Sequence, residues 1–464
     1  MKHTDIIQKL NLEQKCALLS GETVFTTRAL PGKGIPAITL SDGPNGVRKQ
    51  AGAADHLGLN PSVPATCFPT SSATACSWDE KLGEAVGEAL GEEAAAQEVA
   101  VLLGPGLNIQ RSPLCGRDFE YFSEDPILAG RMAAAYVRGI QKNGIAACPK
   151  HFAVNSQELR RMASDSVLDE RTLRELYLTG FEIVVKEAKP KTIMTSYNLI
   201  NGTYANENAH LLQDILRKDW GFDGAVVTDW GGSNDHALGV KNGSTLEMPC
   251  PGGDSIRELM KAVQGGRISE ADVDARLDEM LELVLSTHAA VEKAPRTFDA
   301  AAHHKLARRA AAESIVLLRN EGGILPLKPN EKLAVIGDFA ETPRYQGAGS
   351  SAVNALQVDT LLDCIKADDS GITLVGYASG FERQGAADAE KLEEAVALAR
   401  KADTVLLCLG LDELRESEGL DRADMKLAEN QQQLLAAVAA VNPNVVVLLS
   451  AGAPVETPWV GQCR

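Results

Sequence analysis

Apolar and polar residues alternate along the chain in blocks that predict an α/β protein. From residue 36 to about 290, short apolar runs, each long enough for one buried strand, are separated by amphipathic stretches with helical spacing. The apolar runs are Ala37–Ser41, Val99–Gly104, Ile145–Cys148, Thr192–Tyr197, Ala225–Asp229 and Thr245–Pro249. The amphipathic stretches include Asp79–Ala100, Asp169–Ala188 and Ser255–Gln264. This order predicts a parallel sheet with helices packed outside it.

Polar residues cluster at or just after the ends of most of these runs. They are Asp42, Asn108, Arg111, Lys150, His151, Asn198 and Asp229. Functional side chains at the carboxyl ends of strands are typical of an α/β barrel. An open, doubly wound sheet also binds ligands at its strand ends, so this pattern alone establishes only the α/β class.

A second α/β pattern follows the first. A helix expected at 270–288 closes the first domain, residues 1–293, and a linker with an Ala-rich helix at 300–318 spans residues 294–330. Residues 331–464 hold four more apolar runs, which are Leu333–Gly337, Ile372–Tyr377, Thr404–Leu409 and Val445–Ser450, and helices expected at Ala386–Arg400 and Ala428–Val441. We expect a parallel-sheet sandwich that is incomplete, because the chain stops soon after the fourth run and would leave apolar sheet surface exposed.

Composition excludes several classes of partner. The chain has 464 residues, a net charge of −17 and a pI near 5.0, which argues against binding to nucleic acid or to an anionic membrane. No apolar run reaches membrane-span length, and the start lacks a signal-peptide core, so we expect a cytoplasmic protein. The nine scattered cysteines include no CxxC pair and are predicted to be reduced, mostly buried thiols. No His or Cys residues occur at the spacing of metal ligands. No G-x-G-x-x-G follows a strand, which disfavours a dinucleotide cofactor.

The most informative segment is Val-Val-Thr-Asp-Trp-Gly at 226–231. A buried run there ends in Asp229 and is followed at once by Trp230 and two glycines. One interpretation is a carboxylate at the mouth of a sugar-sized pocket, with the indole as a flat apolar face for a pyranose ring. The alternative is an Asp that caps the next helix.

Cleavage of a glycosidic bond needs a second carboxyl group, protonated as general acid. The loop after Thr404–Leu409 reads LDELRESEGLDR and holds five acids, Asp412, Glu413, Glu416, Glu418 and Asp421, with Arg415 and Arg422. Crowded like charges would keep one of them protonated, although a solvated charged loop has the same composition.

Several longer motifs together resemble glycoside hydrolase family 3, of the β-glucosidase type, over essentially the whole chain. They are SDGPNGVR, RSPLCGRDFEYFSEDP, KHF followed by QELRRM, TSYNLING, VVTDWGG, ESIVLLRNEGGILPL and RYQGAGSS. The resemblance implies a retaining hydrolase with a (β/α)8-type, TIM-like barrel, with some distortion allowed, followed by an α/β/α sandwich. The N-acetylhexosaminidase branch is disfavoured, because its K-H-F-P-G-H-G and Asp-Ser-His elements are absent.

The resemblance also implies roles for individual residues. Asp229 would be the nucleophile, and Glu418, in the form E-G-x-D-R, would be the acid/base. The residues implied to line the sugar subsite are Asp42, Arg48, Arg111, Lys150, His151, Arg161, Tyr197 and Trp230, with Ser350 reaching in from the second domain.

The expected function is that of an exo-acting β-glucosidase that needs no cofactor and acts on small β-glucosides or oligosaccharides. A β-xylosidase or α-arabinofuranosidase of the same family is the alternative among enzymes. Relatives of this type continue well beyond the PVE-x-PW motif, so the other alternative is a catalytically impaired sugar-binding fragment. Such a fragment would need a complementing C-terminal chain, and a homo-oligomer is also left open.

Overall fold

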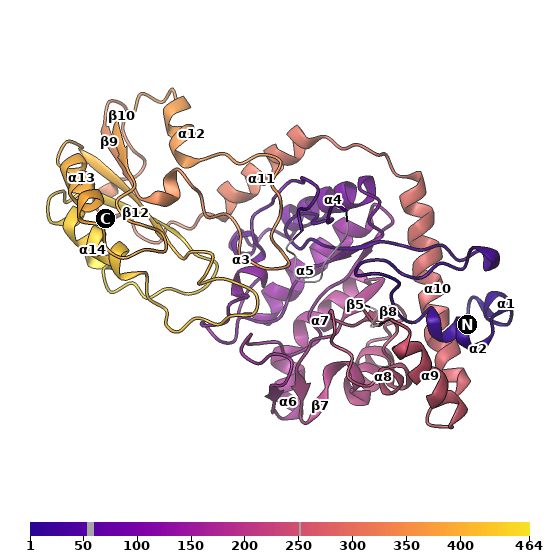
Figure 1. Cartoon of the computed structure of the whole chain (residues 1–464). Coiled ribbons are helices and arrows are strands. Elements are labelled where there is room, and N and C mark those ends of the chain that lie inside the picture. The colour runs from indigo at the N-terminus through magenta and orange to yellow at the C-terminus, as the bar shows by residue number, and fades with distance from the viewer. Residues whose placement is uncertain (53–59, 250–251) are drawn as a thin grey trace. The chain divides into compact units, whose positions relative to one another are not determined.

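The computed structural model describes residues 1–52, 60–249 and 252–464, which form two compact units. Unit 1 comprises residues 1–112, 120–314 and 349–356. Unit 2 comprises residues 113–119, 315–348 and 357–464. Unit 1 therefore includes one short segment from the C-terminal half of the chain, 349–356, and unit 2 includes one from the N-terminal half, 113–119. The colours of Figure 1 follow the chain through both units.

Unit 1 is built on short parallel strands. Strands β1 (Leu40–Asp42), β2 (Val101–Leu103) and β3 (Ala146–Ala147) pair in that order, and β5 (Thr192–Met194) pairs with β8 (Ala225–Val227). Parallel bridges between Phe152 and Thr195, Val227 and Leu246, and Ser20 and Glu247 continue the series, and antiparallel bridges link Gly21 to Thr27 and Thr26 to Thr39. The main-chain pairing thus runs round the unit, as in a barrel, with fewer regular strands in the described residues than an ideal (β/α)8 barrel has. All six apolar runs predicted for this domain contribute residues to this main-chain pairing.

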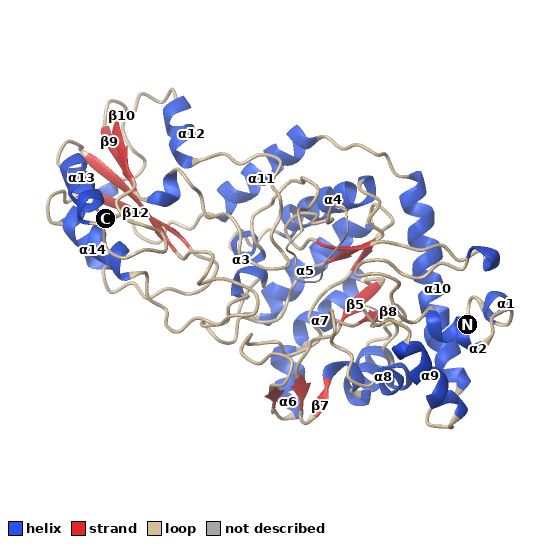
Figure 2. Cartoon of the chain, viewed as in Figure 1, coloured by secondary structure: helices blue, strands red, loops and turns tan. Residues whose placement is uncertain are grey.

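Helices cover this pairing on its outside (Figure 2). They are α1 (Thr4–Ile7), α2 (Leu12–Ala17), α3 (Ser71–Ala75), α4 (Glu80–Ala96), α5 (Pro126–Gln141), α6 (Glu170–Thr172), α7 (Thr179–Ile183), α8 (His236–Asn242), α9 (Asp254–Gln264), α10 (Glu270–Lys293) and α11 (Ala300–Ser314). Wide π-helical turns occupy Leu173–Tyr177, Val184–Ala188 and His210–Asp219. Strands β4 (Asp165–Ser166), β6 (Leu199–Ile200) and β7 (Thr203–Tyr204) form a small separate sheet in that order.

Helices α4 and α5 pack closely because glycines stand at their crossing. A Cβ on Gly139 would lie 2.2 Å from the Glu84 carbonyl oxygen, and one on Gly87 would lie 2.4 Å from that of Tyr136. The sequence analysis singled out α4 but not α5, which is also amphipathic and buries residues such as Met132, Tyr136 and Ile140.

Helix α11 ends earlier than the sequence predicts. It was expected to run to residue 318 and stops at Ser314, where the segment 120–314 of unit 1 also ends. The side chains of Ile315–Leu318 are more than half exposed, so a further helical turn has no apolar face to pack on.

Unit 2 contains a parallel sheet of four strands in the order β10-β9-β11-β12. They are β9 (Lys332–Ile336), β10 (Thr373–Ala378), β11 (Thr404–Gly410) and β12 (Val445–Ser450), as predicted within a residue or two. Helices α12 (Leu361–Ala367), α13 (Ala389–Ala399) and α14 (Glu429–Ala439) accompany them, and α13 packs on α14 (Figure 1). Strand β12 is an edge of this sheet.

The cysteine prediction is confirmed for the described residues. Cys16, Cys115, Cys148, Cys408 and Cys463 are buried, and no disulfide joins any of the eight described cysteines. Cys250 lies outside the described residues. Burial raises the pKa of the Cys148 and Cys408 thiols to about 12, which makes them poor nucleophiles.

Candidate active site

Asp229 lies just past the end of β8 and does not cap a helix. The next helix, α8, is capped by Asp235, whose carboxylate accepts a hydrogen bond from the Leu238 amide at 2.9 Å. One oxygen of Asp229, Oδ1, accepts from the Trp230 amide at 2.7 Å. The other, Oδ2, lies 3.6 Å from His151 Nε2. The capping alternative is therefore wrong, and the carboxylate is held from two sides.

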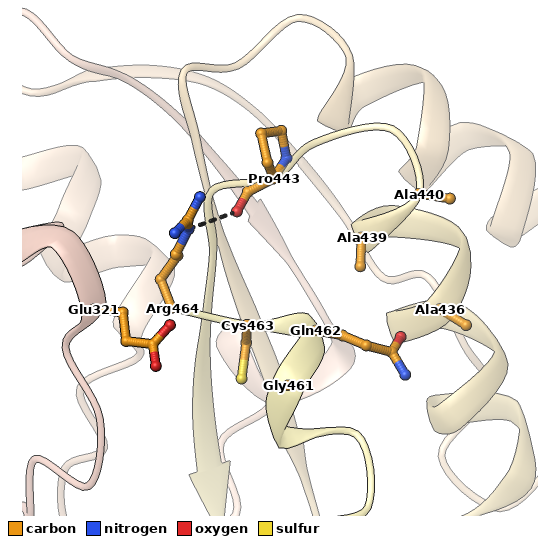
Figure 3. Close-up of a pocket in the computed structure, with 9 residues that line it drawn as sticks. All are labelled: Glu321, Ala436, Ala439, Ala440, Pro443, Gly461, Gln462, Cys463 and Arg464. Atoms are coloured by element: carbon orange, nitrogen blue, oxygen red, sulfur yellow. Dashed lines mark hydrogen bonds between the residues drawn. The ribbon is translucent and has the colours of Figure 1, made fainter.

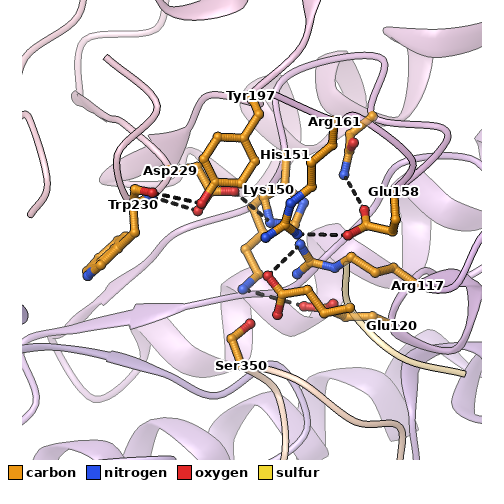
Figure 4. Close-up of polar contacts among 12 residues, drawn as sticks. Arg117, Glu120, Lys150, His151, Glu158, Arg161, Tyr197, Asp229, Trp230 and Ser350 are labelled. Atoms are coloured by element: carbon orange, nitrogen blue, oxygen red, sulfur yellow. Dashed lines mark hydrogen bonds and ion pairs between the residues drawn. The ribbon is translucent and has the colours of Figure 1, made fainter. Parts of the chain in front are cut away.

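Two aromatic side chains are fixed beside this carboxylate (Figure 4). The Trp230 indole donates its N–H to the Val24 carbonyl at 2.7 Å, and its ring packs 5.3 Å from that of Phe25. Tyr197 donates its hydroxyl proton to the Trp230 carbonyl at 2.8 Å, and the Arg161 guanidinium lies 4.8 Å above the Tyr197 ring. Both rings have their polar atoms engaged within the unit, so they offer apolar faces to a ligand.

Lys150 follows β3 and is buried among carboxylates. Its ammonium lies 3.4 Å from Glu120 Oε1 and 4.0 Å from Asp42 Oδ1, and the residue is 2% exposed. A buried cation between two acids is a charged group that can bind several hydroxyls of one sugar ring. Figure 4 shows Lys150 and His151 next to Asp229. The structure thus brings together Asp42, Lys150, His151 and Asp229, which were predicted at the ends of three separate strands.

Arg48 and Ser350 also belong to the cluster in unit 1. The Arg48 amide donates to the Asp42 carbonyl at 2.8 Å, and its guanidinium donates to the Ser350 carbonyl at 3.3 Å. Ser350 belongs to the segment 349–356, which the structure assigns to unit 1, whereas the sequence placed this residue in the second domain. Asn354 in the same segment donates to the Ser62 carbonyl at 2.9 Å, which ties the segment to unit 1.

Arg111 differs from the other predicted subsite residues, which are buried or half-buried. Its side chain is exposed. Arg117, six residues further along the same motif, is 1% exposed, and its guanidinium lies 3.4 Å from Glu418 Oε1. Both residues of that pair belong to unit 2. The motif was recognised in the sequence, but its buried arginine was not distinguished from its exposed one.

The loop that carries Glu418 is held by the segment 113–119. The Gly116 amide donates to Asp421 Oδ1 at 3.1 Å, and the Arg422 amide donates to the Leu114 carbonyl at 2.8 Å. On its other side, the Glu418 amide donates to the Ala348 carbonyl at 3.0 Å. Backbone contacts therefore fix the position of Glu418 within unit 2.

The other acids of this loop have separate structural partners. Glu413 pairs with Arg383 at 2.9 Å, while Glu416 pairs with Arg344 at 3.2 Å and accepts from the Gly452 amide at 2.8 Å. Burial, ahead of the nearby charge of Asp412, raises the pKa of Glu416, and Arg344 lowers it. Like-charge crowding, which the sequence suggested, is thus not the main influence on this buried acid.

Asp118 is a further buried acid in unit 2 that the sequence did not single out. It is 1% exposed. Burial, with a contribution from the charge of Glu416, raises the pKa of Asp118 to about 8, although Arg422 opposes this. It stands one residue from Arg117.

Four more residues of the unit 1 cluster were missed, namely Glu120, Tyr121, Asn155 and Glu158. All four are at most 2% exposed. Glu120 and Tyr121 lie within the recognised motif FEYF, and Glu158 lies within QELRRM, so the motifs contained them without showing which side chains point inward. Glu158 Oε2 pairs with Arg161 at 2.7 Å, which explains how Arg161 is held over Tyr197.

The described residues hold no cluster of three or more His, Cys, Asp or Glu side chains suited to a metal ion. Nor does any helix among them combine the length and apolar character needed to span a bilayer.

A pocket elsewhere in unit 2 does not have the chemistry of this site. It has a volume of about 580 Å³ and is lined by Glu321, Ala436, Ala439, Ala440, Pro443, Gly461, Gln462, Cys463 and Arg464 (Figure 3). None of these is a predicted site residue, and the Arg464 guanidinium donates to the Pro443 carbonyl at 3.3 Å.

Comparison with known families identifies the chain. Residues 48–283 match the glycosyl hydrolase family 3 N terminal domain, and residues 315–464 match the family's C-terminal domain. The chain belongs to glycosyl hydrolase family 3. The predicted family and fold class, a TIM-like domain followed by a second α/β domain, are confirmed.

Similar family 3 proteins include enzymes of two named specificities. The chain is 46% identical over 463 residues to thermostable beta-glucosidase B of Acetivibrio thermocellus, covering 99% of this chain and 61% of that protein. It is 44% identical over 470 residues to exo-alpha-(1->6)-L-arabinopyranosidase of Bifidobacterium longum, again covering 99% and 61%. The chain therefore spans about three fifths of the length of these relatives.

Solved structures agree with the family assignment. The GH3 beta-glucosidase of Bifidobacterium adolescentis superposes with a TM-score of 0.92 at 42% identity, covering 98% of this chain and 65% of that one. Beta-glucosidase 3B of Thermotoga neapolitana, in complex with glucose, gives a TM-score of 0.89 at 33% identity, covering 100% and 71%.

Proposed function

We propose that the chain is a retaining, exo-acting β-glucosidase that removes terminal, non-reducing β-D-glucosyl residues from small glucosides. The observation that carries this proposal is the setting of Asp229. One of its oxygens is fixed by the Trp230 amide, and the other faces His151, beside two aromatic faces and the buried Lys150. Membership of family 3 and the similarity to named beta-glucosidases support the same reaction.

The reaction proceeds in two steps, formation and then hydrolysis of a glycosyl ester on Asp229. In the first, Asp229 Oδ2 forms an ester bond to the anomeric carbon while the bond from that carbon to the leaving oxygen breaks. Glu418 donates a proton to the departing oxygen. In the second, Glu418 takes a proton from water, the water oxygen bonds to the anomeric carbon, and Asp229 leaves.

Unit 1 supplies the groups that would bind the sugar. Asp42 and Glu120 accept hydrogen bonds from hydroxyls, and Lys150 donates to hydroxyls from between them. Trp230 and Tyr197 would cover the apolar face of the ring. The reaction needs no metal or organic cofactor. Retention requires the two carboxyl groups to come within about 5–5.5 Å of each other.

A pentopyranosidase is the second candidate. The 44% identity to proteins named exo-alpha-(1->6)-L-arabinopyranosidase favours an L-arabinopyranoside, a six-membered ring without the hydroxymethyl group of glucose. Nitrophenyl β-D-glucopyranoside, β-D-xylopyranoside and α-L-arabinopyranoside, compared by kcat/KM, separate these specificities, and an α-L-arabinofuranoside tests the furanose form. A cytoplasmic location and a homo-oligomer or complementing chain remain predictions.

Replacing the two carboxyl groups tests the proposal. Asp229→Ala should lower kcat for a chromogenic β-glucoside by roughly 10³-fold or more, because it removes the nucleophile. Added azide should give the α-glycosyl azide with Asp229→Ala and the β-glycosyl azide with Glu418→Ala, since azide then replaces the nucleophile or the deprotonated water.

Asp235→Asn is the matched control, because Asn caps α8 as well as Asp does. It should keep normal activity. Full activity in Asp229→Ala would refute the assignment of the nucleophile. A purified, folded 464-residue chain without turnover of any glycoside would instead support a sugar-binding fragment.

A further inference from the structure

We propose that Tyr121 is a positioning residue that holds His151 as the neutral imidazole with its proton on Nε2, the atom that faces Asp229. The tautomer itself follows from hydrogen-bond geometry in unit 1. Its kinetic consequence rests on the function proposed above.

The argument begins with the two partners of the Tyr121 hydroxyl. Tyr121 is completely buried, and its oxygen lies 3.1 Å from His151 Nδ1 and 3.0 Å from Asn155 Nδ2. The Tyr121 and His151 rings meet edge to face, with centroids 6.2 Å apart. The His151 amide donates to Asn108 Oδ1 at 2.8 Å, so the backbone below the ring is also fixed.

Glu158 decides which end of the Asn155 amide faces Tyr121. The same Asn155 nitrogen lies 3.4 Å from Glu158 Oε1, and the other oxygen of Glu158 pairs with Arg161 at 2.7 Å. An ionised carboxylate only accepts hydrogen bonds, so the group beside it must be the amide NH2. Asn155 therefore donates one proton towards Glu158 and the other to the Tyr121 oxygen.

The direction of the remaining hydrogen bond follows. The Tyr121 oxygen accepts from Asn155 and also lies within hydrogen-bond distance of His151 Nδ1, and in the proposed arrangement its own proton is directed to that nitrogen, which is then unprotonated. A neutral ring that accepts at Nδ1 carries its proton on Nε2, which lies 3.6 Å from Asp229 Oδ2. The chain of donors thus runs from Asn155 through Tyr121 and His151 towards Asp229.

This arrangement suits a nucleophile that must attack a cationic transition state. A neutral N–H stabilises the Asp229 carboxylate without adding an imidazolium beside the positive charge that develops on the sugar ring. The two cationic side chains Lys150 and Arg161 of this cluster are each paired with carboxylates. Lys150 lies between Glu120 and Asp42, and Arg161 pairs with Glu158.

Nitrogen NMR of the ¹⁵N-histidine-labelled chain tests the tautomer without reference to activity. Among the eight histidines, the resonances lost in His151→Gln identify the residue. At neutral pH we expect His151 Nδ1 to be pyridine-like and Nε2 pyrrole-like. A protonated Nδ1 in the unmutated chain, as either the other tautomer or an imidazolium, would overturn the proposal, whatever the variants do.

Tyr121→Phe removes the hydroxyl and keeps the ring. It should move His151 towards a mixture of tautomers, lower kcat/KM by roughly ten- to a hundredfold and act mainly on kcat. Tyr136→Phe is the matched control, because Tyr136 is also buried but lies on α5, and it should change neither the spectrum nor the kinetics.

The outcomes separate this proposal from the proposed function. An unchanged His151 spectrum in folded Tyr121→Phe would show that Tyr121 does not set the tautomer. The expected tautomer in a chain that hydrolyses no glycoside would refute the proposed function and leave the positioning role intact.

Discussion

At the scale of single residues, Gly116 explains how the segment 113–119 can hold the loop of Glu418. A Cβ at this position would lie 1.7 Å from the Leu420 carbonyl oxygen and 2.4 Å from that of Ser417. Both contacts are to backbone, which cannot move aside as the end of a side chain can. Only glycine therefore fits between the segment and the loop on either side of Glu418.

We predict that Gly116→Ala displaces Glu418 while it leaves the cluster around Asp229 in place. Activity towards natural glucosides, whose leaving groups need a proton, should fall by roughly 10²-fold or more, and activity towards dinitrophenyl glucosides should fall much less. Steady-state kinetics with a series of aryl glucosides of graded leaving-group pKa measures this difference. Gly461→Ala, where a Cβ meets nothing within 4 Å, is the control. Equal losses across the series would contradict the prediction.

The sequence predicted those residues whose positions depend on strand ends. Asp42, Lys150 and Asp229 each follow a buried run, and the carboxyl ends of parallel strands converge, so their proximity could be expected. Arg117 could not be told from Arg111 in this way. The segment that holds them is a loop, and neither period 2 nor period 3.6 gives the direction of a side chain there. The partners of Tyr121 depend on the same kind of irregular backbone.

At the scale of elements, helix α11 is attached to α4 through one buried histidine. His303 Nδ1 lies 2.7 Å from Glu93 Oε1, and its Nε2 lies 3.2 Å from Glu92 Oε2. The Phe298 ring stacks on His303 at 5.4 Å, and Glu93 is fully buried and accepts from the Thr66 amide at 3.0 Å. Two carboxylates and one imidazole thus join the last helix of unit 1 to the body of that unit.

We predict that the attachment of α11 weakens as pH rises. Burial lowers the pKa of His303, but the hydrogen bonds and charges of Glu93 and Glu92 outweigh it, and the pKa is raised above 6.5. A raised histidine pKa contributes stability that is complete below 6.5 and is lost as pH rises through the folded-state value. Hydrogen exchange of the α11 amides, corrected for its intrinsic rate, should therefore show less protection at pH 9 than at pH 6.

The control for this prediction lies on the neighbouring helix. His303→Gln should reduce protection at pH 6 and remove most of its pH dependence. His288→Gln on α10, where the histidine only pairs with Glu292 at 3.4 Å near the surface, should leave both unchanged. The same pH dependence in His303→Gln would show that another group is responsible.

The elements themselves were predicted well where one face is buried and less well elsewhere. The four strands of unit 2 are long and apolar, and they appear within a residue or two of their predicted bounds. Helix α5 was not singled out in the sequence, although its apolar residues recur at helical spacing as those of α4 do. The end of α11 was misplaced, because Ile315–Leu318 look like the continuation of a helix but have nothing to pack on.

At the scale of the whole molecule, the buried apolar side chains form two separate clusters. One contains residues of unit 1 from Ile7 to Val353, and the other contains residues of unit 2 from Leu333 to Cys463. Each cluster is large enough to drive a cooperative transition of its own. The proposed reaction needs both units folded, since Asp229 belongs to one and Glu418 to the other.

We therefore predict two thermal transitions that respond to different substitutions. Leu277→Ala on α10 and Leu407→Ala on β11 each remove a completely buried side chain, one from each cluster, at a cost of roughly 2–5 kcal/mol. In differential scanning calorimetry each variant should lower the midpoint of one transition and leave the other in place. A single transition that both variants shift equally would show that the two cores unfold together. Activity should disappear with the first transition, because either carboxyl group alone cannot complete both steps of the reaction.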